Sequence, residues 1–450
     1  MRTLREVLAS LAHLAETRAD DVALTDGHTQ LTYARLAGRV AHLAHSLIDA
    51  PQTIAIFAPN SADWVVADLA LALAGKTMVP LPTFFSAEQL THIMSNAGVE
   101  LVLTTHATET FDVPTQVLTD SSDTAAWPDD LSAADEASRI IYTSGTTGAP
   151  KGVVIGARQI GASARGLVAA SGASASDRYL SVLPFSLLLE QIAAICVPLL
   201  AGAPVTINAT AAGAALRNDP FPLVEAFATV RPTSSVLVPG LLEAWVHGLG
   251  VSGLRAPDCL RFIAVGGAPV SSVVSDAAWA LGIPVHEGYG LSECCSVVSV
   301  NRPGARVPGT AGVPLDGLAV TIEDGEIVIS GPTVMCGYLR RENLTSQVWH
   351  TGDMGEITPE GAVRVLGRKD NLIVTQNGRN ISPEWVESLA FTAHGVAAAK
   401  LSLNAEQELV LSVTPRPGHS GPNLTEAVRA SLSTAPDYAQ PAHIEVRTGT

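Results

Sequence analysis

Cysteine is scarce in this sequence, with five among 450 residues. The five are Cys196, Cys259, Cys294, Cys295 and Cys336, an odd-numbered set without the spacing typical of metal ligands. Structural disulfides belong mainly to oxidising compartments. The cysteine pattern therefore predicts a reduced, cytoplasmic protein with no cysteine-based metal site.

Positive charge is also in short supply. Lys and Arg together number 27 against 43 Asp and Glu, which gives a formal net charge of −16. A surface of this sign repels the phosphate backbone of DNA or RNA. The composition argues against nucleic acid as a partner.

The chain has no long apolar run. The most apolar stretch, 192–205, follows Glu190 and is interrupted by Pro198 and Pro204. It is too short to span a bilayer and predicts a buried helix followed by a strand. Segment 1–21 contains acidic residues and no small-residue cleavage site, so it predicts a surface helix and not a signal peptide.

Alternating strand and helix patterns indicate the fold class. A chain of 450 residues exceeds what one core usually organises, so two or more domains are expected. Residues 53–57 form an apolar strand pattern, and a helical pattern over 62–74 ends at Gly75. The same strand pattern returns at 101–104, 235–238 and 262–265. The sequence therefore predicts layered α/β structure to about residue 300.

The pattern changes after residue 300, where short segments alternate with Gly and Pro. These segments, at 319–322, 326–329 and 362–365, predict a small β-barrel-like region. Two helical patterns follow, at 383–392 and 424–432. We therefore predict an α/β protein with a large N-terminal domain over 1–366 and a small α+β C-terminal domain over 367–450.

A glycine-rich loop is the most informative local feature. Residues 143–152 read TSGTTGAPKG directly after an apolar strand pattern. Glycine lets backbone N–H groups approach an anion, the hydroxyls add donors, and Lys151 supplies positive charge. Composition alone is equally typical of a flexible turn. Pro150 stands where the common phosphate loop of kinases and GTPases requires glycine, so the string predicts a nucleotide site in a different fold.

Three further strings suit a nucleotide. In 288–293, GYGLSE, flanking glycines let the Tyr289 ring lie flat against a ligand, and Glu293 offers an oxygen ligand for Mg²⁺. In 349–353, WHTGD, Asp353 is placed to accept ribose hydroxyls. The third string is VGGAP at 265–269. Taken singly, each string also has a purely structural interpretation: a core tyrosine, a turn-forming aspartate and an ordinary turn.

Together, and in this order, the strings resemble the signatures of the adenylate-forming superfamily. This superfamily includes acyl-CoA and aryl-CoA synthetases, the adenylation domains of peptide synthetases and firefly-type luciferases. A further string, GRKDNLI from Gly367, matches its paired signature, and flanking stretches extend the likeness over most of the chain. The stretch LPFSLLLE at 183–190 is most similar to long-chain fatty acyl-CoA synthetases.

The resemblance implies a role for each matching residue. The catalytic residues would be Lys151, Glu293 and Arg368. The phosphate would be bound by Thr143, Ser144, Gly145, Thr146, Thr147, Gly148, Lys151 and Ser292. The adenine and acyl pocket would be lined by Gly266, Gly267, Ala268, Tyr289 and Gly290. Asp353 and Arg368 would bind the ribose, Glu293 would bind the metal, and Lys369 or Asp370 would be the hinge of a mobile C-terminal domain.

The implied reaction needs ATP and Mg²⁺. A carboxylic acid is activated as an acyl adenylate with release of pyrophosphate, and the acyl group then passes to a thiol. The thiol belongs to coenzyme A or to the phosphopantetheine of an acyl carrier protein. The alternatives are a non-catalytic module that binds a nucleotide or acyl adenylate, and adenylation of an unusual anion with a non-thiol acceptor.

The sequence departs from the family pattern at two places. The family uses a lysine near its C-terminus, whereas no lysine follows Lys400 here. This predicts a shortened C-terminal domain in which Arg379 or Arg447 substitutes, a partner supplies the charge, or adenylation is lost; we favour a short, active enzyme. Leu187 stands where the family commonly has histidine, which implies an apolar pocket, a different route for the thiol, or no consequence.

Overall fold

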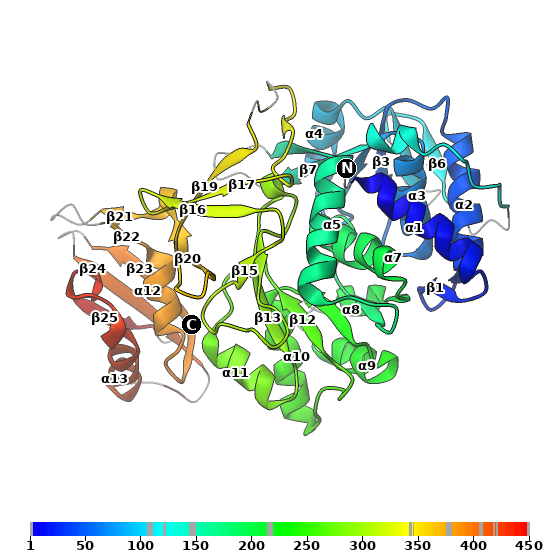
Figure 1. Cartoon of the computed structure of the whole chain (residues 1–450). Coiled ribbons are helices and arrows are strands. Elements are labelled where there is room, and N and C mark those ends of the chain that lie inside the picture. The colour runs from blue at the N-terminus through cyan, green and yellow to red at the C-terminus, as the bar shows by residue number, and fades with distance from the viewer. Residues whose placement is uncertain are drawn as a thin grey trace.

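The structure is a computed structural model that describes residues 3–105, 111–119, 123–143, 150–213, 219–341, 344, 346–374, 380–404, 408–416, 419 and 422–447. Two large β-sheets with flanking helices form most of the chain (Figure 1). A smaller β-rich part and a C-terminal α+β part follow on the opposite side of the molecule from the first helices (Figure 1). This arrangement confirms the predicted α/β class.

The first sheet contains nine of the described strands, in the order β15-β14-β13-β12-β11-β9-β10-β1-β2. Their bounds are β1 Val22–Thr25, β2 Gln30–Thr32, β9 Tyr179–Ser181, β10 Val205–Ile207, β11 Ser234–Leu237, β12 Phe262–Val265, β13 Val285–Tyr289, β14 Ser299–Val300 and β15 Val313–Pro314. Strands β9, β11, β12 and β13 are parallel neighbours. Their carboxyl ends therefore meet at one edge, where α/β sheets commonly bind ligands.

The second sheet contains seven described strands, in the order β18-β8-β7-β4-β3-β5-β6. Their bounds are β3 Thr53–Phe57, β4 Thr77–Pro80, β5 Leu101–Thr104, β6 Thr115–Val117, β7 Ser138–Thr143, β8 Lys151–Gly156 and β18 Gly337–Tyr338. Strands β7 and β8 pair antiparallel, with Thr143 opposite Lys151. The glycine-rich segment thus connects two paired strands, although residues 144–149 lie outside the described residues.

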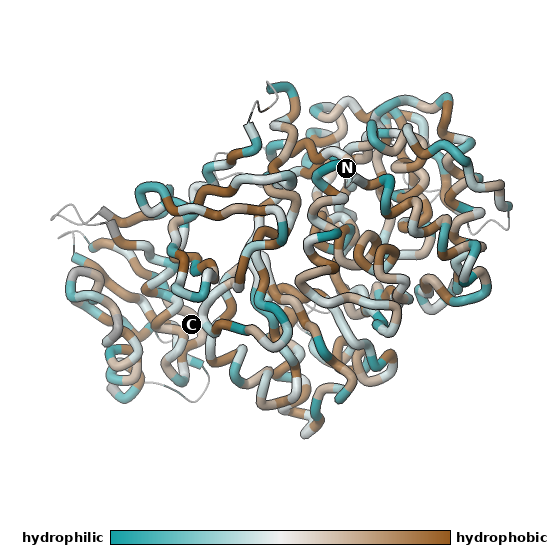
Figure 2. Tube along the Cα trace, in the orientation of Figure 1, coloured by the Kyte–Doolittle hydropathy of each residue, from teal (hydrophilic) through white to brown (hydrophobic). Residues whose placement is uncertain are grey.

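Helices flank both sheets. Their bounds are α1 Leu4–Thr17, α2 Tyr33–Ser46, α3 Ala62–Leu73, α4 Ala87–Ala97, α5 Ala157–Ser171, α8 Ala209–Ala212, α9 Phe221–Val230, α10 Pro239–Ser252 and α11 Ser272–Ala280. Helix α3 is buried at every residue except Asp63, and apolar residues lie on all sides of it. Apolar segments follow the strands and packed helices, and hydrophilic segments gather at turns (Figure 2).

The apolar stretch 192–205 differs from the single helix that the sequence predicts. Helix α6, Leu188–Glu190, continues into a π-helix over Gln191–Cys196 and then into α7, Val197–Ala201, before β10 begins. Pro198 is the second residue of α7, so its missing N–H falls directly after the π segment, where the helical hydrogen-bond pattern changes. A π-helix widens the backbone and often marks a functional site.

The β-rich region after residue 300 is confirmed. It contains an antiparallel sheet in the order β16-β17-β19-β20. The bounds are β16 Ala319–Glu323, β17 Glu326–Ser330, β19 Val348–Ile357 and β20 Val363–Arg368. The last strand of this sheet ends at Arg368, and a short 3₁₀ turn, Lys369–Asn371, follows it.

The C-terminal part has a hydrophobic cluster of its own, which includes Ile381, Val386, Leu411 and Val428. Its elements are β21 Ile373–Val374, β22 Asn380–Ile381, α12 Pro383–Ala390, β23 Val396–Leu403, β24 Leu409–Pro415, α13 Pro422–Ser431 and β25 His443–Val446. The large N-terminal and small C-terminal parts match the predicted organisation. The boundary after residue 366 stays a prediction.

None of the helices in the described part of the chain combines the length and apolarity that a membrane crossing requires. No group of three His, Cys, Asp or Glu side chains among the described residues is arranged to hold a metal ion. All five cysteines are free thiols.

A buried ion pair links the second sheet to the helices. Arg139 of β7 donates through Nη2 to Asp68 Oδ2 of α3 at 2.8 Å and through Nη1 to Gln191 Oε1 of the π-helix at 2.9 Å. The two charged side chains are 3% and 1% exposed. Each charge depends on the other, because an unpaired buried charge is costly.

We expect Arg139→Met to lower the free energy of unfolding by about 3–5 kcal/mol, because it leaves Asp68 buried without its partner. Urea denaturation measures the loss. The control is Arg165→Met, which removes a half-exposed surface pair with Glu6 and should cost about 0–1 kcal/mol. Equal losses in the two variants would contradict this role of the buried pair.

Candidate functional site

A cavity of about 310 Å³ opens at the carboxyl edge of the first sheet. Its wall is formed mainly by apolar side chains from α5, from the helix that contains the π segment, and from β11 and β12. These include Leu167, Leu183, Leu187, Leu188, Leu189, Ala193, Val197, Val236, Val238, Phe262, Ala264 and Val265. Leu187 is 37% exposed, so this leucine reaches from the cavity to solvent. The cavity suits an apolar ligand body.

Backbone of two predicted strings lines the same cavity. Gly266 and Gly267 come directly after β12, and the segment 288–292 lies at the end of β13. A Cβ atom on Gly290 would lie 1.6 Å from the carbonyl oxygen of Ser296, so only glycine fits that turn. The described lining does not include Ala268, which is exposed. The structure thus brings four of the five predicted pocket residues to the cavity.

Asp353 connects the tyrosine of this turn to the β-rich region. Tyr289 Oη donates to Asp353 Oδ2 at 2.5 Å, and Arg368 Nη1 donates to Asp353 Oδ1 at 2.9 Å. Burial, together with the negative charge of Asp353, raises the pKa of Tyr289 well above its usual range. The hydroxyl therefore stays protonated and acts as a donor. Both residues predicted to bind ribose are thus adjacent to the residue predicted to pack on adenine.

The structure describes only some of the residues that are predicted to bind phosphate. Thr143, the last residue of β7, lies opposite Lys151, the first residue of β8. Ser292 lines the cavity and begins the 3₁₀ turn that carries Glu293. The other predicted phosphate ligands, Ser144, Gly145, Thr146, Thr147 and Gly148, lie outside the described residues.

Glu293 fits the chemistry of a Mg²⁺ ligand in a nucleotide site. Mg²⁺ is usually held by one or two carboxylates and by the phosphates of the substrate, so a single glutamate is sufficient. Glu293 Oε1 accepts a hydrogen bond from Tyr338 Oη at 2.8 Å. Sequence reasoning missed Tyr338, because nothing local to Gly337-Tyr338-Leu339 indicates that this tyrosine contacts a residue 45 positions earlier.

The predicted hinge residues begin the turn after β20. Lys369 Nζ contacts Glu326 Oε2 at 2.8 Å, and the backbone N–H of Gly352 donates to Glu326 Oε1 at 2.8 Å. The bond from Lys369 lowers the pKa of Glu326. Asp370 is exposed. Lys369 is therefore tied to β17 of the β-rich sheet, which comes before the turn in the chain. The hinge role itself stays a prediction.

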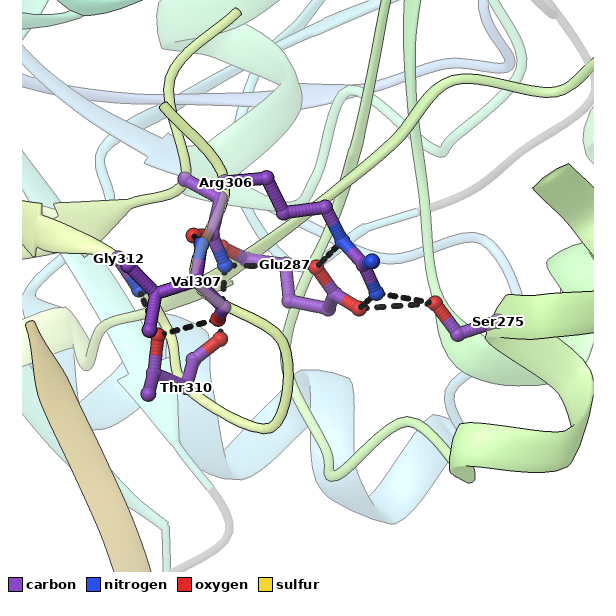
Figure 3. Close-up of polar contacts among 7 residues, drawn as sticks. Ser275, Glu287, Arg306, Val307, Thr310 and Gly312 are labelled. Atoms are coloured by element: carbon purple, nitrogen blue, oxygen red, sulfur yellow. Dashed lines mark hydrogen bonds and ion pairs between the residues drawn. The ribbon is translucent and has the colours of Figure 1, made fainter. Parts of the chain in front are cut away.

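A polar cluster fixes the strand that leads into the GYGLSE turn. Arg306 faces Glu287 of β13, and Ser275 of α11 completes the contact (Figure 3). Arg306 Nη2 lies 2.6 Å from Glu287 Oε1, and Ser275 Oγ donates to the same oxygen at 2.8 Å. The buried Asn301 joins this cluster to Val307, so the loop after β14 is tied to the strand that ends at Tyr289.

Arg261 is the only cationic residue among the described residues that line the cavity, and its charge is already paired. Its Nε donates to Asp177 Oδ1 at 2.6 Å, and its Nη2 contacts the other carboxylate oxygen. Burial alone would raise the pKa of Asp177, but hydrogen bonds from Arg261 and Thr233 hold it below its usual value. The described wall therefore contains no unpaired positive charge.

Glu190 lies behind the wall, fully buried at the start of the π-helix. Tyr179, which lines the cavity, donates to Glu190 Oε2 at 3.2 Å. Burial raises the pKa of Glu190 to about 8, although the hydrogen bond from Tyr179 opposes the shift. The carboxyl group is therefore neutral through most of the physiological range, and it adds no negative charge to the wall.

Comparison with known proteins now identifies the family. Residues 11–339 match the family model described as "AMP-binding enzyme". The chain belongs to this family. The match confirms the adenylate-forming superfamily that the motifs resemble, and it covers most of the predicted N-terminal domain.

Similar proteins of this family are ligases that use coenzyme A. The 2-succinylbenzoate–CoA ligase of Bacillus cereus is 30% identical over 431 residues, which cover 89% of this chain and 85% of that protein. The o-succinylbenzoate CoA synthetase of Bacillus subtilis, solved with its acyl-adenylate intermediate, has a TM-score of 0.78 at 26% identity and covers 97% of this chain and 94% of the other. The anthranilate CoA ligase AuaEII has a TM-score of 0.85 at 17% identity, covers 98% and 93%, and shows the fold alone.

The protein is an AMP-forming acid–thiol ligase. It activates a carboxylic acid as an acyl adenylate, with ATP and Mg²⁺, and passes the acyl group to a thiol. This confirms the predicted reaction and sets aside the non-catalytic alternative. The finer likeness to long-chain fatty acyl-CoA synthetases is not supported, since these relatives act on aromatic acids.

We expect Glu190→Gln to change how stability depends on pH. The native pKa of about 8 exceeds the ordinary value of 4.5, so the native state holds a proton that the unfolded chain releases. The stabilising effect is full below pH 4.5 and is lost as pH rises toward 8. Melting temperatures between pH 5 and pH 9 should fall less steeply in Glu190→Gln than in the wild type.

The matched control is Glu243→Gln, because Glu243 is 57% exposed in its pair with Arg416. It should keep the wild-type pH dependence. A Glu190→Gln profile parallel to that of the wild type would contradict the raised pKa.

Proposed function

We propose that this chain adenylates a carboxylic acid with an uncharged, apolar body and transfers it to coenzyme A. One observation carries the proposal: a single cavity has an apolar wall and, at one end, the glycine turn that holds Tyr289. The body of the acid would occupy the wall region. Its carboxylate would meet the nucleotide at the turn.

The proposed roles follow from the charges around that turn. Attack by a carboxylate is difficult because the group is already anionic, so the protein must align it with the α-phosphorus and neutralise charge. Lys151 and the loop from Thr143 to Gly148 would hold the phosphates together with Ser292. Glu293 would hold Mg²⁺, which supplies charge neutralisation when bound.

The nucleoside would lie between the two glycine-containing strings at the ends of β12 and β13. Tyr289 and Gly290, with Gly266 and Gly267, would contact adenine, and Asp353 with Arg368 would bind the ribose. Lys369 and Asp370 would form the hinge about which the region 367–450 moves before thiol transfer. Coenzyme A is favoured over a carrier protein as the acceptor, because the named relatives are CoA ligases.

A second candidate substrate is 2-succinylbenzoate, which the similarity to its ligases favours. This acid has two carboxylates, of which one remains after adenylation. Placing that second charge in the cavity would require a cation, and the described wall offers only Arg261, which Asp177 already neutralises. Burial of an unpaired carboxylate costs several kcal/mol. The cavity therefore supports a monocarboxylic acid.

The test compares two acids that differ by that one group. We expect 3-benzoylpropionate, which lacks the aromatic carboxylate, to support ATP–pyrophosphate exchange with a kcat/KM at least about tenfold above that of 2-succinylbenzoate, since tenfold corresponds to only about 1.4 kcal/mol. Straight-chain acids of increasing length should define how much apolar body the cavity accepts.

Lys151→Gln is the negative control, and it should reduce exchange with every acid by about 10²–10³. A preference for 2-succinylbenzoate would overturn the apolar assignment. Absence of exchange with every acid in the panel would overturn the proposed function.

A further inference from the structure

Tyr338 is fixed rigidly beside the strand that begins with Lys151. Strand β18 pairs with β8, so that Tyr338 lies opposite Val153. On either side of β18, the backbone N–H of Cys336 donates to Val154 at 2.9 Å and that of Leu339 donates to Gly152 at 2.8 Å. The position of the tyrosine is therefore set by the sheet.

The same segment holds Glu293 at two points. The backbone N–H of Met335 donates to the carbonyl oxygen of Glu293 at 2.8 Å, and Tyr338 Oη donates to its carboxylate oxygen Oε1 at 2.8 Å. Among the described residues, the carboxylate has no other side-chain hydrogen bond. One oxygen is thus oriented by the protein, and Oε2 is left for a ligand.

Positive charge is gathered around the ring of Tyr338. Lys151 Nζ lies 5.9 Å from the ring centroid, and Arg341 Cζ lies 5.6 Å from it. Trp349 packs edge-on at 5.9 Å. Cations are attracted to an aromatic face. The ring of Tyr338 therefore contacts Lys151, and its hydroxyl contacts the Glu293 carboxylate.

We propose that Tyr338 is a positioning residue of the adenylation site, which holds the Glu293 carboxylate and the Lys151 ammonium in place for Mg²⁺ and the nucleotide phosphates. The assignment rests on the proposed function of Glu293 and Lys151. A hydrogen bond to an ionised carboxylate is stronger than a neutral one and limits the rotamers of Glu293. Partners of this kind usually change metal affinity or activity by about 10–100-fold when removed.

The test is Tyr338→Phe, which keeps the ring and removes only the hydroxyl. Binding of ATP is measured by titration calorimetry over a series of Mg²⁺ concentrations, together with kcat and KM for pyrophosphate exchange. We expect the Mg²⁺ concentration for half-maximal ATP binding to rise about tenfold. The melting temperature should stay unchanged, and kcat should recover at saturating Mg²⁺.

Tyr142→Phe is the matched control. Its hydroxyl is also partly buried and donates to Asn96 Oδ1 at 2.6 Å, away from Glu293. This variant should keep the wild-type Mg²⁺ dependence. In a Glu293→Gln background, Tyr338→Phe should cause no further shift, because coupled residues are not additive.

The outcomes separate the two proposals. Unchanged Mg²⁺ dependence in Tyr338→Phe, or an equal shift in Tyr142→Phe, would overturn the role of Tyr338 and leave the proposed function standing. A wild-type protein that binds no ATP at any Mg²⁺ concentration would overturn the proposed function, and the role of Tyr338 with it.

Discussion

The carboxylate of Asp353 is the constraint on which the site depends. A carboxylate with so little exposure needs hydrogen-bond donors, and within the described residues two side chains from different parts of the chain donate to it. Tyr289 ends β13 of the first sheet, and Arg368 ends β20 of the β-rich sheet. The Asp353 side chain thus joins the glycine turn that lines the cavity to the β-rich sheet. Two carboxylate oxygens accept about four hydrogen bonds, so both keep capacity for further donors, as the proposed ribose binding requires.

Three other acidic side chains near the site follow the same principle. Glu287 is paired with Arg306, Glu326 with Lys369, and Asp177 with Arg261. Although the protein has a net charge of −16, its site is therefore close to electrically balanced. Lys151 contributes its positive charge where phosphates are expected, and the wall of the cavity stays neutral. This division suits a reaction whose acid has an apolar body and one anionic end.

Local patterns predicted much of the fold. Strands β3, β5 and β12 have the bounds that the apolar runs indicate, and α3 ends at Leu73, with Ala74 as its C-cap before Gly75, whose φ of +69° favours glycine. The π-helix was missed, because hydrophobic periodicity does not distinguish a π turn from an α turn within a run that is apolar on all sides. Tertiary packing decides such a case.

The site was predicted mainly through the resemblance, since short strings alone were ambiguous. The adjacency of Tyr289, Asp353 and Arg368 agrees with it. Tyr338 and Glu190 could not be found this way, because their significance comes from contacts made across the fold and not from neighbours in sequence. Ala268 lies outside the described lining of the cavity, and its place in the pocket stays a prediction.

The most direct measurement is a crystal structure of the protein with a sulfamoyl analogue of an apolar acyl adenylate. The ribose hydroxyls should contact the carboxylate of Asp353, the adenine should lie against Tyr289, and the acyl group should fill the cavity beside Leu187 and Val197. An analogue bound with its ribose away from Asp353, or with its acyl group outside the cavity, would contradict the central claim.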